Sequence, residues 1–316
     1  MEAEKSAVVA QILVEGDLLG HDSHGLAQLP NYLKALASGA LKPTGQPAIL
    51  KDRGAMALWD GEWLSGCWLV TQAIDVAITK AEAFGIGIVS IRRAHHTACL
   101  QAYLQRATDR GFMLVLATSD PSAASVAPYG GRQAVFGTDP YAVGIPTSGD
   151  PILIDMSSAI IANGMVKHYA DAGESLPGPW VQDAAGVVGT DPGVFFATPR
   201  GSLLTTGGVD HGHKGFGMAL ANEALTHGLS GHGRIKGEKS LTQSMFIQVI
   251  DPDFFSGLDA FSAETAFLAD LCRTSPARDP GSPIRLPGER ALAHKRQALA
   301  EGVPLQPAVA SAIGLT

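Results

Sequence analysis

Apolar residues recur at helical spacing in several stretches of the chain. In residues 2–19 they fall at Val8, Val9, Ile12, Leu13 and Leu18. A helix with this pattern is expected to bury one side against a partner surface. The same spacing predicts further helices at residues 26–37, 68–84, 97–110 and 216–229. Gly39, Gly85 and Gly111 follow the first three of these further helices and are expected to end them.

Short apolar runs between turn residues predict strands that alternate with these helices. The runs lie at residues 55–59, 87–91, 113–117, 151–155 and 244–250. Residues 120–149 are predicted to be mostly loop, and residues 170–205, which are rich in Gly, Pro and Asp, are predicted to be irregular. The alternation of strands and helices indicates an α/β fold, and 316 residues are enough for about two domains.

Composition and charge narrow the class of protein. The net charge is −7 and the basic residues form no cluster, which argues against nucleic acid or an anionic membrane as a partner. Cys67, Cys99 and Cys272 are far apart in the sequence, so a disulfide framework is not expected and a reducing cytoplasm fits. No apolar run reaches the roughly 18 residues of a membrane span, and the N-terminus does not resemble a signal peptide.

Two segments carry side chains suited to proton transfer. One is Gly20-His21-Asp22-Ser23-His24-Gly25, where polar groups stand between two predicted helices. The other is His95-His96, which follows a predicted strand at the end of the sheet where ligands gather in α/β folds. The alternatives are a helix cap at Asp22 or Ser23 and a solvated pair at His95-His96.

Other segments could hold an anion or a metal. The loops at residues 118–120 and 137–140 offer backbone N–H groups, and Asp155 or Ser157 could cap a helix after the strand at residues 151–155. Lys214 lies beside glycines at a predicted helix start, which suits a phosphate. His211 and His213 could instead bind a metal, although no third ligand stands at a suitable spacing. No GxGxxG or GxxxxGK[ST] motif is present.

Taken in order, six segments resemble the malate/L-lactate dehydrogenase family, which includes ureidoglycolate dehydrogenase, sulfolactate dehydrogenase and diketogulonate reductase. They are GHDSHGLAQLPNYLKALASG, the His95-His96 loop, APYGG…FGTDPYAVGIP, ILIDMSSAIIANG, HKGFGMALANEAL and PIRLPGER. The resemblance covers residues 7–303. It implies an oxidoreductase that uses NAD or NADP without a Rossmann domain and acts on a small 2-hydroxy/2-oxo or imino compound.

The resemblance also implies how the chain is organised. Residues 1–58 plus 252–316 are expected to form a discontinuous helical domain from both chain ends, and residues 59–251 an α/β cofactor-binding domain. Members of the family are usually homodimers, with the active site between the two domains. The chain begins later than its relatives relative to the Ser23-His24-Gly25 segment, so a first helix is expected to be missing.

The resemblance implies roles for single residues. His96 matches the catalytic histidine, which exchanges a proton with the substrate, and Ser23 and His24 match the pair that lines the nicotinamide and substrate pocket. The positions that would contact substrate are Gln28, Tyr32 and Thr138. Those that would contact the cofactor are Asp120, Asp155, Met156, Ser157, Lys214, Gly288, Glu289 and Arg290. No metal is implied.

Four residues depart from the family pattern. Gln28 stands where an arginine resembles a clamp for the substrate carboxylate, and Met165 where a lysine is common. Asp139 replaces a common asparagine and Asp120 a common serine. Two further functions therefore stay open: a metal-dependent hydrolase built on His211, His213 and Asp155, and a ligand-binding relative with impaired catalysis.

Overall fold

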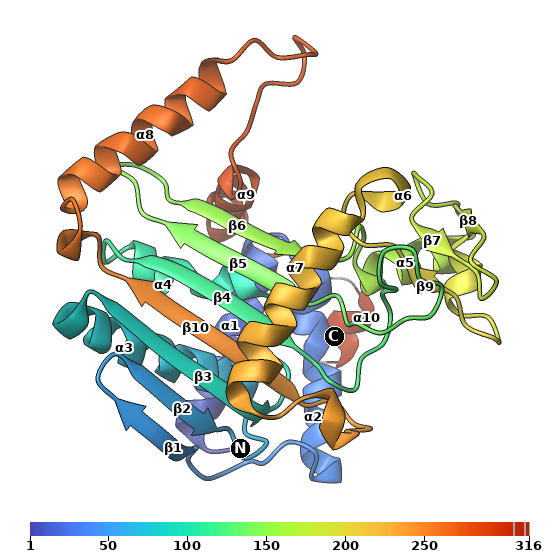
Figure 1. The fold of residues 1–316 in the computed structure, drawn as a ribbon, viewed down its shortest axis with the longest axis horizontal. Coiled ribbons are helices and arrows are strands. Elements are labelled where there is room, and N and C mark those ends of the chain that lie inside the picture. Colours follow the sequence, from blue (N-terminus) through green and yellow to red (C-terminus); the bar gives the residue numbers. More distant parts are fainter. Residues whose placement is uncertain (306, 313, 316) are drawn as a thin grey trace. The chain divides into compact units, whose positions relative to one another are not determined.

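The computed structural model describes residues 1–305, 307–312, 314 and 315. Its main sheet has seven strands in the order β1-β2-β3-β10-β4-β5-β6 (Figure 1). The strands are β1 (Ala48–Arg53), β2 (Met56–Asp60), β3 (Ile86–Ala94), β4 (Met113–Ser119), β5 (Pro140–Ile145), β6 (Ile152–Ser157) and β10 (Gln243–Ile250). The pairing of β1 with β2 is antiparallel and that of β2 with β3 is parallel, so the sheet is mixed and the predicted α/β class is confirmed.

Helices precede the first strand, join some of the strands and follow β10. They are α1 (Ala3–Leu18), α2 (Leu29–Ser38), α3 (Gly66–Phe84), α4 (Gln105–Thr108), α5 (Asn163–Ala172), α6 (Gly208–His211), α7 (His213–Glu223), α8 (Leu258–Thr274), α9 (Glu289–Glu301) and α10 (Pro307–Ala312). Short 3-10 turns include η1 (Asp22–His24), η2 (Leu26–Gln28) and η3 (Leu100–Tyr103). A smaller antiparallel sheet has the order β8-β7-β9, from β7 (Val181–Gln182), β8 (Val188–Gly189) and β9 (Ser202–Leu203).

The chain divides into two compact units. Unit 1 consists of Met1–Leu116, Ala142–Asp155 and Phe246–Thr316, and unit 2 of Ala117–Tyr141 and Met156–Met245. Unit 2 has a core of its own, formed by Val126, Phe136, Ala159, Ile161, Val166, Leu176, Val181, Phe195, Leu203 and Ala219. These units have other bounds than the domains that the sequence predicts, 1–58 plus 252–316 and 59–251. The division into a helical domain and a cofactor-binding domain stays a prediction.

Several elements differ from the sequence-based expectation. The helix expected at residues 97–110 is broken into η3 and α4, and β1 and β5 lie where no strand was expected. Every side chain of β1 is exposed, so this strand lacks the apolar alternation that would identify it. Strand β6 continues through Ser157, and α5 begins only at Asn163, so the expectation that Asp155 or Ser157 caps a helix is wrong.

Helix α1 buries one face, but the face is not purely apolar. Its buried residues are Lys5, Val9, Ile12, Leu13, Gly16 and Asp17, which follow helical spacing. Lys5 lies 4.2 Å from the centre of the Trp68 ring and pairs with Glu2, so its ammonium is compensated although only 1% of the residue is exposed. Burial of Asp17 places a carboxylate under the turn that follows the helix.

Helix α3 packs against the backbone that carries His95 and His96. A Cβ atom added to Gly66, at its first turn, would lie 2.2 Å from the His95 carbonyl oxygen and 2.7 Å from that of His96. These distances are far below van der Waals contact, so only glycine permits this approach. The start of α3 therefore fixes the position of the two histidines.

Gly66→Ala is expected to lower the free energy of unfolding by about 1–3 kcal/mol, as overpacking does in a core that cannot yield. Gly217→Ala is the matched control, because Gly217 is also helical and a Cβ there meets nothing within 4 Å. That substitution is expected to be neutral or to stabilise by up to about 1 kcal/mol through helix propensity. Chemical denaturation measures both, and equal effects would contradict the steric argument.

Candidate active site

The turn that carries Ser23 and His24 is held by the end of α1. A carboxylate oxygen of Asp17 accepts the backbone N–H of Leu26 at 2.9 Å. A Cβ on Gly25 would lie 1.8 Å from the other Asp17 oxygen, so the turn can approach α1 only because residue 25 is glycine. Burial raises the pKa of Asp17, and the hydrogen bond from Leu26 partly opposes that shift.

Ser23 and His24 form a hydrogen-bonded pair close to His96. The Ser23 hydroxyl lies 2.9 Å from His24 Nδ1, and either group can be the donor. The rings of His24 and His96 have centroids 5.9 Å apart. Burial, together with the neighbouring His21, lowers the pKa of His24 and favours the neutral ring.

Tyr32 and Ala98 orient the ring of His96. The Tyr32 hydroxyl lies 2.9 Å from His96 Nδ1, and the backbone N–H of Ala98 donates to the same nitrogen at 3.3 Å. An N–H group cannot accept a hydrogen bond, so Nδ1 carries the lone pair and the neutral ring holds its proton on Nε2. Ala98 has a φ of 58°, which is strained for a residue other than glycine.

His95 and His96 have different surroundings. His95 is buried, with 7% of its surface exposed, whereas His96 remains partly exposed. Burial lowers the pKa of His95 to about 4. Burial also lowers the pKa of His96 to about 3, with contributions from His24 and His95. Both rings are therefore neutral at pH 7, and only His96 reaches solvent to a substantial extent.

Tyr32 on α2 and Gln28 just before it, both expected to contact substrate, already form hydrogen bonds with other residues of the protein. Tyr32 is buried, and its hydroxyl also lies 3.7 Å from Cys67 Sγ. The Gln28 amide donates to the Ser23 carbonyl at 2.6 Å and accepts from Asn31 at 3.1 Å. Gln28 is still partly exposed, and its amide retains one N–H and one lone pair for a ligand.

Four of the positions expected to face the nicotinamide or the rest of the cofactor lie in unit 2, Asp120 and Thr138 in loops and Met156 and Ser157 at the end of β6. The Thr138 carbonyl accepts hydrogen bonds from both the N–H and the hydroxyl of Ser158, each at 3.0 Å. The Asp120 carboxylate accepts from the N–H and hydroxyl of Ser122, which closes a tight turn. Met156 is exposed, and the Ser157 hydroxyl donates to the Ala159 carbonyl.

The start of α7 combines an exposed lysine with closely packed glycines. The helix begins at His213, earlier than the sequence pattern indicates, so Lys214 lies in its first turn and is exposed. A Cβ on Gly212 would lie 2.4 Å from the Gly208 carbonyl oxygen, and one on Gly215 would lie 2.4 Å from the Thr206 nitrogen. Lys214 has no ion-pair partner among the residues that the structure describes. A free ammonium beside a helix N-terminus fits the phosphates of a dinucleotide.

The remaining cofactor positions lie in unit 1. Gly288 has a φ of 94° and begins α9, where a Cβ would meet Leu153 at 2.8 Å. Glu289 pairs with Arg273 and accepts the N–H of Leu286, while Arg290 is exposed. Asp155 accepts the N–H of Gln101 at 2.8 Å, and burial raises its pKa.

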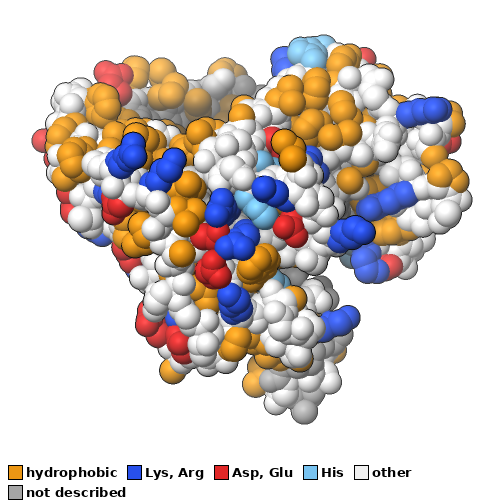
Figure 2. All heavy atoms as spheres, turned by 60° about the horizontal axis from the view of Figure 1, so that its bottom comes forward, with side chains coloured by type: hydrophobic (Ala, Val, Ile, Leu, Met, Phe, Trp, Pro, Cys, Tyr) orange, Lys and Arg blue, Asp and Glu red, His pale blue; other side chains and the backbone are white. Residues whose placement is uncertain are grey.

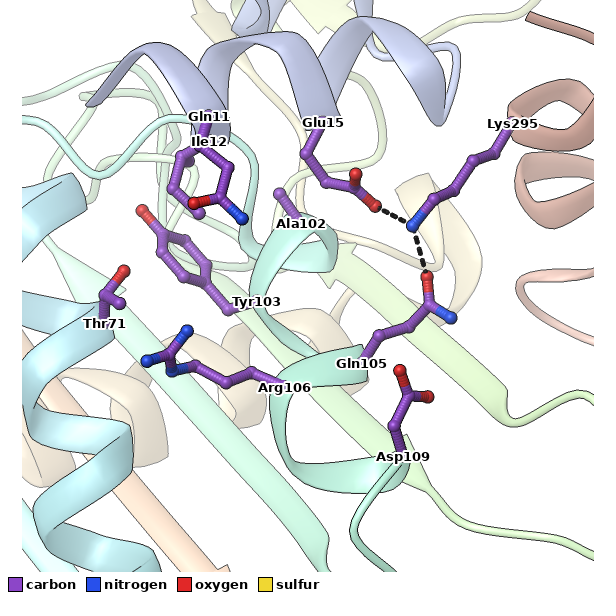
Figure 3. A pocket seen from close by; sticks show the side chains of 10 residues that line it. All are labelled: Gln11, Ile12, Glu15, Thr71, Ala102, Tyr103, Gln105, Arg106, Asp109 and Lys295. Atoms are coloured by element: carbon purple, nitrogen blue, oxygen red, sulfur yellow. Dashed lines mark hydrogen bonds and ion pairs between the residues drawn. The ribbon is translucent and has the colours of Figure 1, made fainter. Parts of the chain in front are cut away.

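A separate pocket of about 190 Å³ lies among α1, α3, α4 and α9 (Figure 3). Lys295 bridges Glu15 and Gln105 at its rim, and Arg106 pairs with Asp75 through two hydrogen bonds. None of the predicted catalytic residues lines this pocket, and its charged residues Lys295, Glu15 and Arg106 already have ion-pair partners.

The surface shows charges of both signs. On the face drawn in Figure 2, basic side chains lie among acidic and apolar ones and form no single basic surface. Within the described part of the chain, no helix is long and apolar enough to cross a membrane. His211 and His213 have ring centroids 6.1 Å apart, and among the described residues they belong to no group of three potential metal ligands.

Sequence reasoning missed three residues that shape the site. Asp17 holds the turn that carries Ser23, Ala98 sets the tautomer of His96, and Gln101 bonds both His21 and Asp155. The only sequence signal for Asp17 is its place on the buried stripe of α1, four residues after Leu13. The roles of Ala98 and Gln101 depend on backbone geometry that no residue pattern specifies.

The sequence profile of the malate/L-lactate dehydrogenase family matches residues 1–314. The chain belongs to the malate/L-lactate dehydrogenase family. An L-lactate dehydrogenase from Cupriavidus necator is 34% identical over 310 residues, which cover 95% of this chain and 87% of that protein. Hydroxycarboxylate dehydrogenase B from Escherichia coli is 32% identical over 312 residues, covering 96% of this chain and 84% of that protein.

A solved structure extends the comparison to three dimensions. The delta1-piperideine-2-carboxylate reductase from Pseudomonas syringae pvar. tomato superposes with a TM-score of 0.88 at 27% identity, covering 100% of this chain and 94% of that one. Dehydrogenases of the malate/L-lactate family act on CH–OH groups and depend on a pyridine nucleotide. The chain is therefore an oxidoreductase of this type, and its family leaves the metal-dependent hydrolase on His211, His213 and Asp155 without support.

Proposed function

We propose that this chain transfers hydride between NAD or NADP and a small 2-hydroxy/2-oxo or imino compound, with His96 as acid/base. Family membership supports the reaction class, and the named substrates of its relatives are hydroxycarboxylates and a cyclic imino acid. The observation that carries the proposal is the pair of hydrogen bonds on His96 Nδ1, which leaves Nε2 as the ring nitrogen that can meet a ligand. When bound, the nicotinamide supplies or accepts the hydride.

In the reductive direction His96 acts first as a hydrogen-bond donor. Its Nε2–H is the form fixed by Ala98 and Tyr32, and it can bond the carbonyl oxygen or imine nitrogen of the substrate. That bond strengthens as negative charge develops on the acceptor atom during hydride transfer. To act as the acid, the ring passes its Nε2 proton to the substrate while Nδ1 takes a proton from solvent, so the ring stays neutral and its lone pair moves to Nε2. Ser23 and His24 lie close to the same ring.

In the oxidative direction the ring must accept a proton on Nε2, and Tyr32 makes this possible. The Tyr32 hydroxyl also lies 3.3 Å from the His96 carbonyl oxygen. If it rotates to donate there, its oxygen can accept Nδ1–H, and the lone pair then resides on Nε2. Tyr32 can thus support both tautomers of His96, although the Ala98 N–H favours the donor form.

A homodimer is the proposed assembly. Helix α8 buries only Ala269, while Phe267, Leu268 and Leu271 are more than half exposed. Figure 1 shows α8 in unit 1, followed by an extended segment that leads to α9. Such an apolar face is typical of a surface that a second copy covers.

The three free cysteines support a reducing compartment such as the cytoplasm, which cell fractionation can test.

His96→Ala is expected to lower kcat by about 100-fold or more, the usual size of a general acid–base contribution. Affinity for the reduced cofactor should stay nearly unchanged, because the proposed cofactor positions are elsewhere in the sequence. His95→Ala is the neighbouring control and is expected to retain more activity, once both variants are shown to be folded. An active His96→Ala enzyme beside an inactive, folded His95→Ala enzyme would reverse the assignment.

Lys214→Ala is expected to weaken NAD(P)H binding by about 1–3 kcal/mol, since it removes a charge-assisted contact to phosphate. Lys167→Ala is the control, because it removes the same charge from a lysine of unit 2 that is already paired with Asp171. Calorimetric titration of both reduced cofactors measures the effect. Equal affinities of wild type and Lys214→Ala would exclude the contact.

Gln28→Arg is expected to raise kcat/KM for pyruvate-like or oxaloacetate-like substrates by roughly 10- to 150-fold, because an arginine offers a charged fork to the carboxylate. The wild-type amide suits a less charged group, so wild type should prefer the amide of a 2-oxo acid over the acid itself. Steady-state kinetics on an acid and its amide test both statements. If wild type already prefers the acid, or if Gln28→Arg does not raise kcat/KM for the acid, Gln28 does not contact the substrate.

Light scattering at micromolar concentration is expected to show a dimer for wild type. Leu268→Glu should shift it toward monomer, because a charge on α8 would be buried in the interface. Leu299→Glu is the control, since Leu299 is similarly exposed but lies on α9. A monomeric wild type, or a dimer that Leu268→Glu leaves intact, would contradict the role of α8.

A further inference from the structure

Three side chains that could bind a metal meet in unit 1. One ring nitrogen of His21, the sulfur of Cys99 and a carboxylate oxygen of Asp155 all lie within 4.8 Å of one another. His21 lies in the turn after α1, Cys99 just before η3, and Asp155 on β6. They are more than 50 residues apart in the sequence, so their spacing does not indicate a metal site.

Gln101 organises this cluster. Its side-chain nitrogen donates to the Leu153 carbonyl at 3.0 Å, which turns the amide oxygen toward His21 Nε2 at 2.7 Å. His21 therefore donates from Nε2 and keeps the lone pair on Nδ1. Histidines that ligate metals usually donate their other ring N–H to a carbonyl or carboxylate in this way. The backbone N–H of Gln101 also bonds Asp155 at 2.8 Å and so orients the carboxylate.

The distances suit a small tetrahedral ion after a limited adjustment. Bonds of 2.0–2.3 Å to nitrogen, oxygen and sulfur place neighbouring ligands about 3.3–3.8 Å apart. Cys99 Sγ already lies 3.8 Å from an Asp155 oxygen. His21, on a turn and partly exposed, would need to move by at most about 1.5 Å, given the 4.8 Å limit.

We propose that His21, Cys99 and Asp155 bind one divalent transition-metal ion of the zinc type, with the fourth position open to water. A thiolate, an imidazole and a carboxylate form a donor set that zinc accepts and that magnesium and calcium disfavour. On binding, the metal–sulfur bond forms while the Cys99 S–H bond breaks and its proton leaves to solvent. The ion would tie the turn that carries Ser23 and His24 to strand β6.

Cobalt(II) is the probe, because a thiolate–cobalt bond gives a charge-transfer absorption that zinc lacks. Chelator-treated wild type is expected to show this band, to saturate at one ion per chain, and to lose the band when zinc is added. Cys99→Ser should abolish the band. Cys272→Ser should retain it, because Cys272 is the free cysteine outside both this cluster and the Tyr32 contact. His21→Gln should weaken binding by at least tenfold.

His213→Gln is the control for cobalt binding at a surface site formed by His211 and His213. It is expected to leave the absorption band unchanged. Thermal unfolding checks that each variant is folded, and zinc should raise the melting temperature of wild type but not of Cys99→Ser. A wild type without the band, or a band that survives in Cys99→Ser or disappears in His213→Gln, would overturn the proposal. Because absorption and melting need no turnover, failure here is distinct from failure of the proposed dehydrogenase reaction.

Discussion

The hydrogen bond between the Tyr32 hydroxyl and His96 Nδ1 is the interaction on which the proposed chemistry depends. It joins α2 to the loop after β3, and it requires that the loop lie against the start of α3 at Gly66. Without that close approach the histidine would still be present, but its ring would not be held against Tyr32. Glycine at a helix start thus has a direct consequence for the position of a distant ring.

The sequence predicted elements where burial follows a regular period. Strands β2, β3, β4, β6 and β10 and helices α1 and α3 were found from apolar spacing, within a few residues of their observed bounds. The failures share a physical cause. Strand β1 is exposed on both sides, and the left-handed backbone at Ala98 interrupts the helix that residues 97–110 would otherwise favour.

For the candidate site, the family resemblance and the residue types pointed to His96, Ser23 and His24, and the structure places these three in one unit with adjacent rings. The supporting residues could not be found in that way. Asp17 is a carboxylate on a buried helix face, a position where a charged residue is normally excluded. It is tolerated because a backbone N–H satisfies it, and only the folded turn creates that partner.

Two departures from the family pattern, Asp139 and Gln28, differ in how far they can imitate the residue that is common in the family. Asp139 is buried beside Glu223, and burial together with that carboxylate raises its pKa well above the usual range although Arg234 opposes the shift. The shift favours the protonated carboxyl of Asp139, and that form offers one donor and one acceptor, as asparagine does. Gln28 instead replaces a permanent charge with a neutral amide, and no protonation equilibrium can restore it. Of these two departures, Asp139 can thus still imitate asparagine, whereas Gln28 cannot imitate arginine in any protonation state.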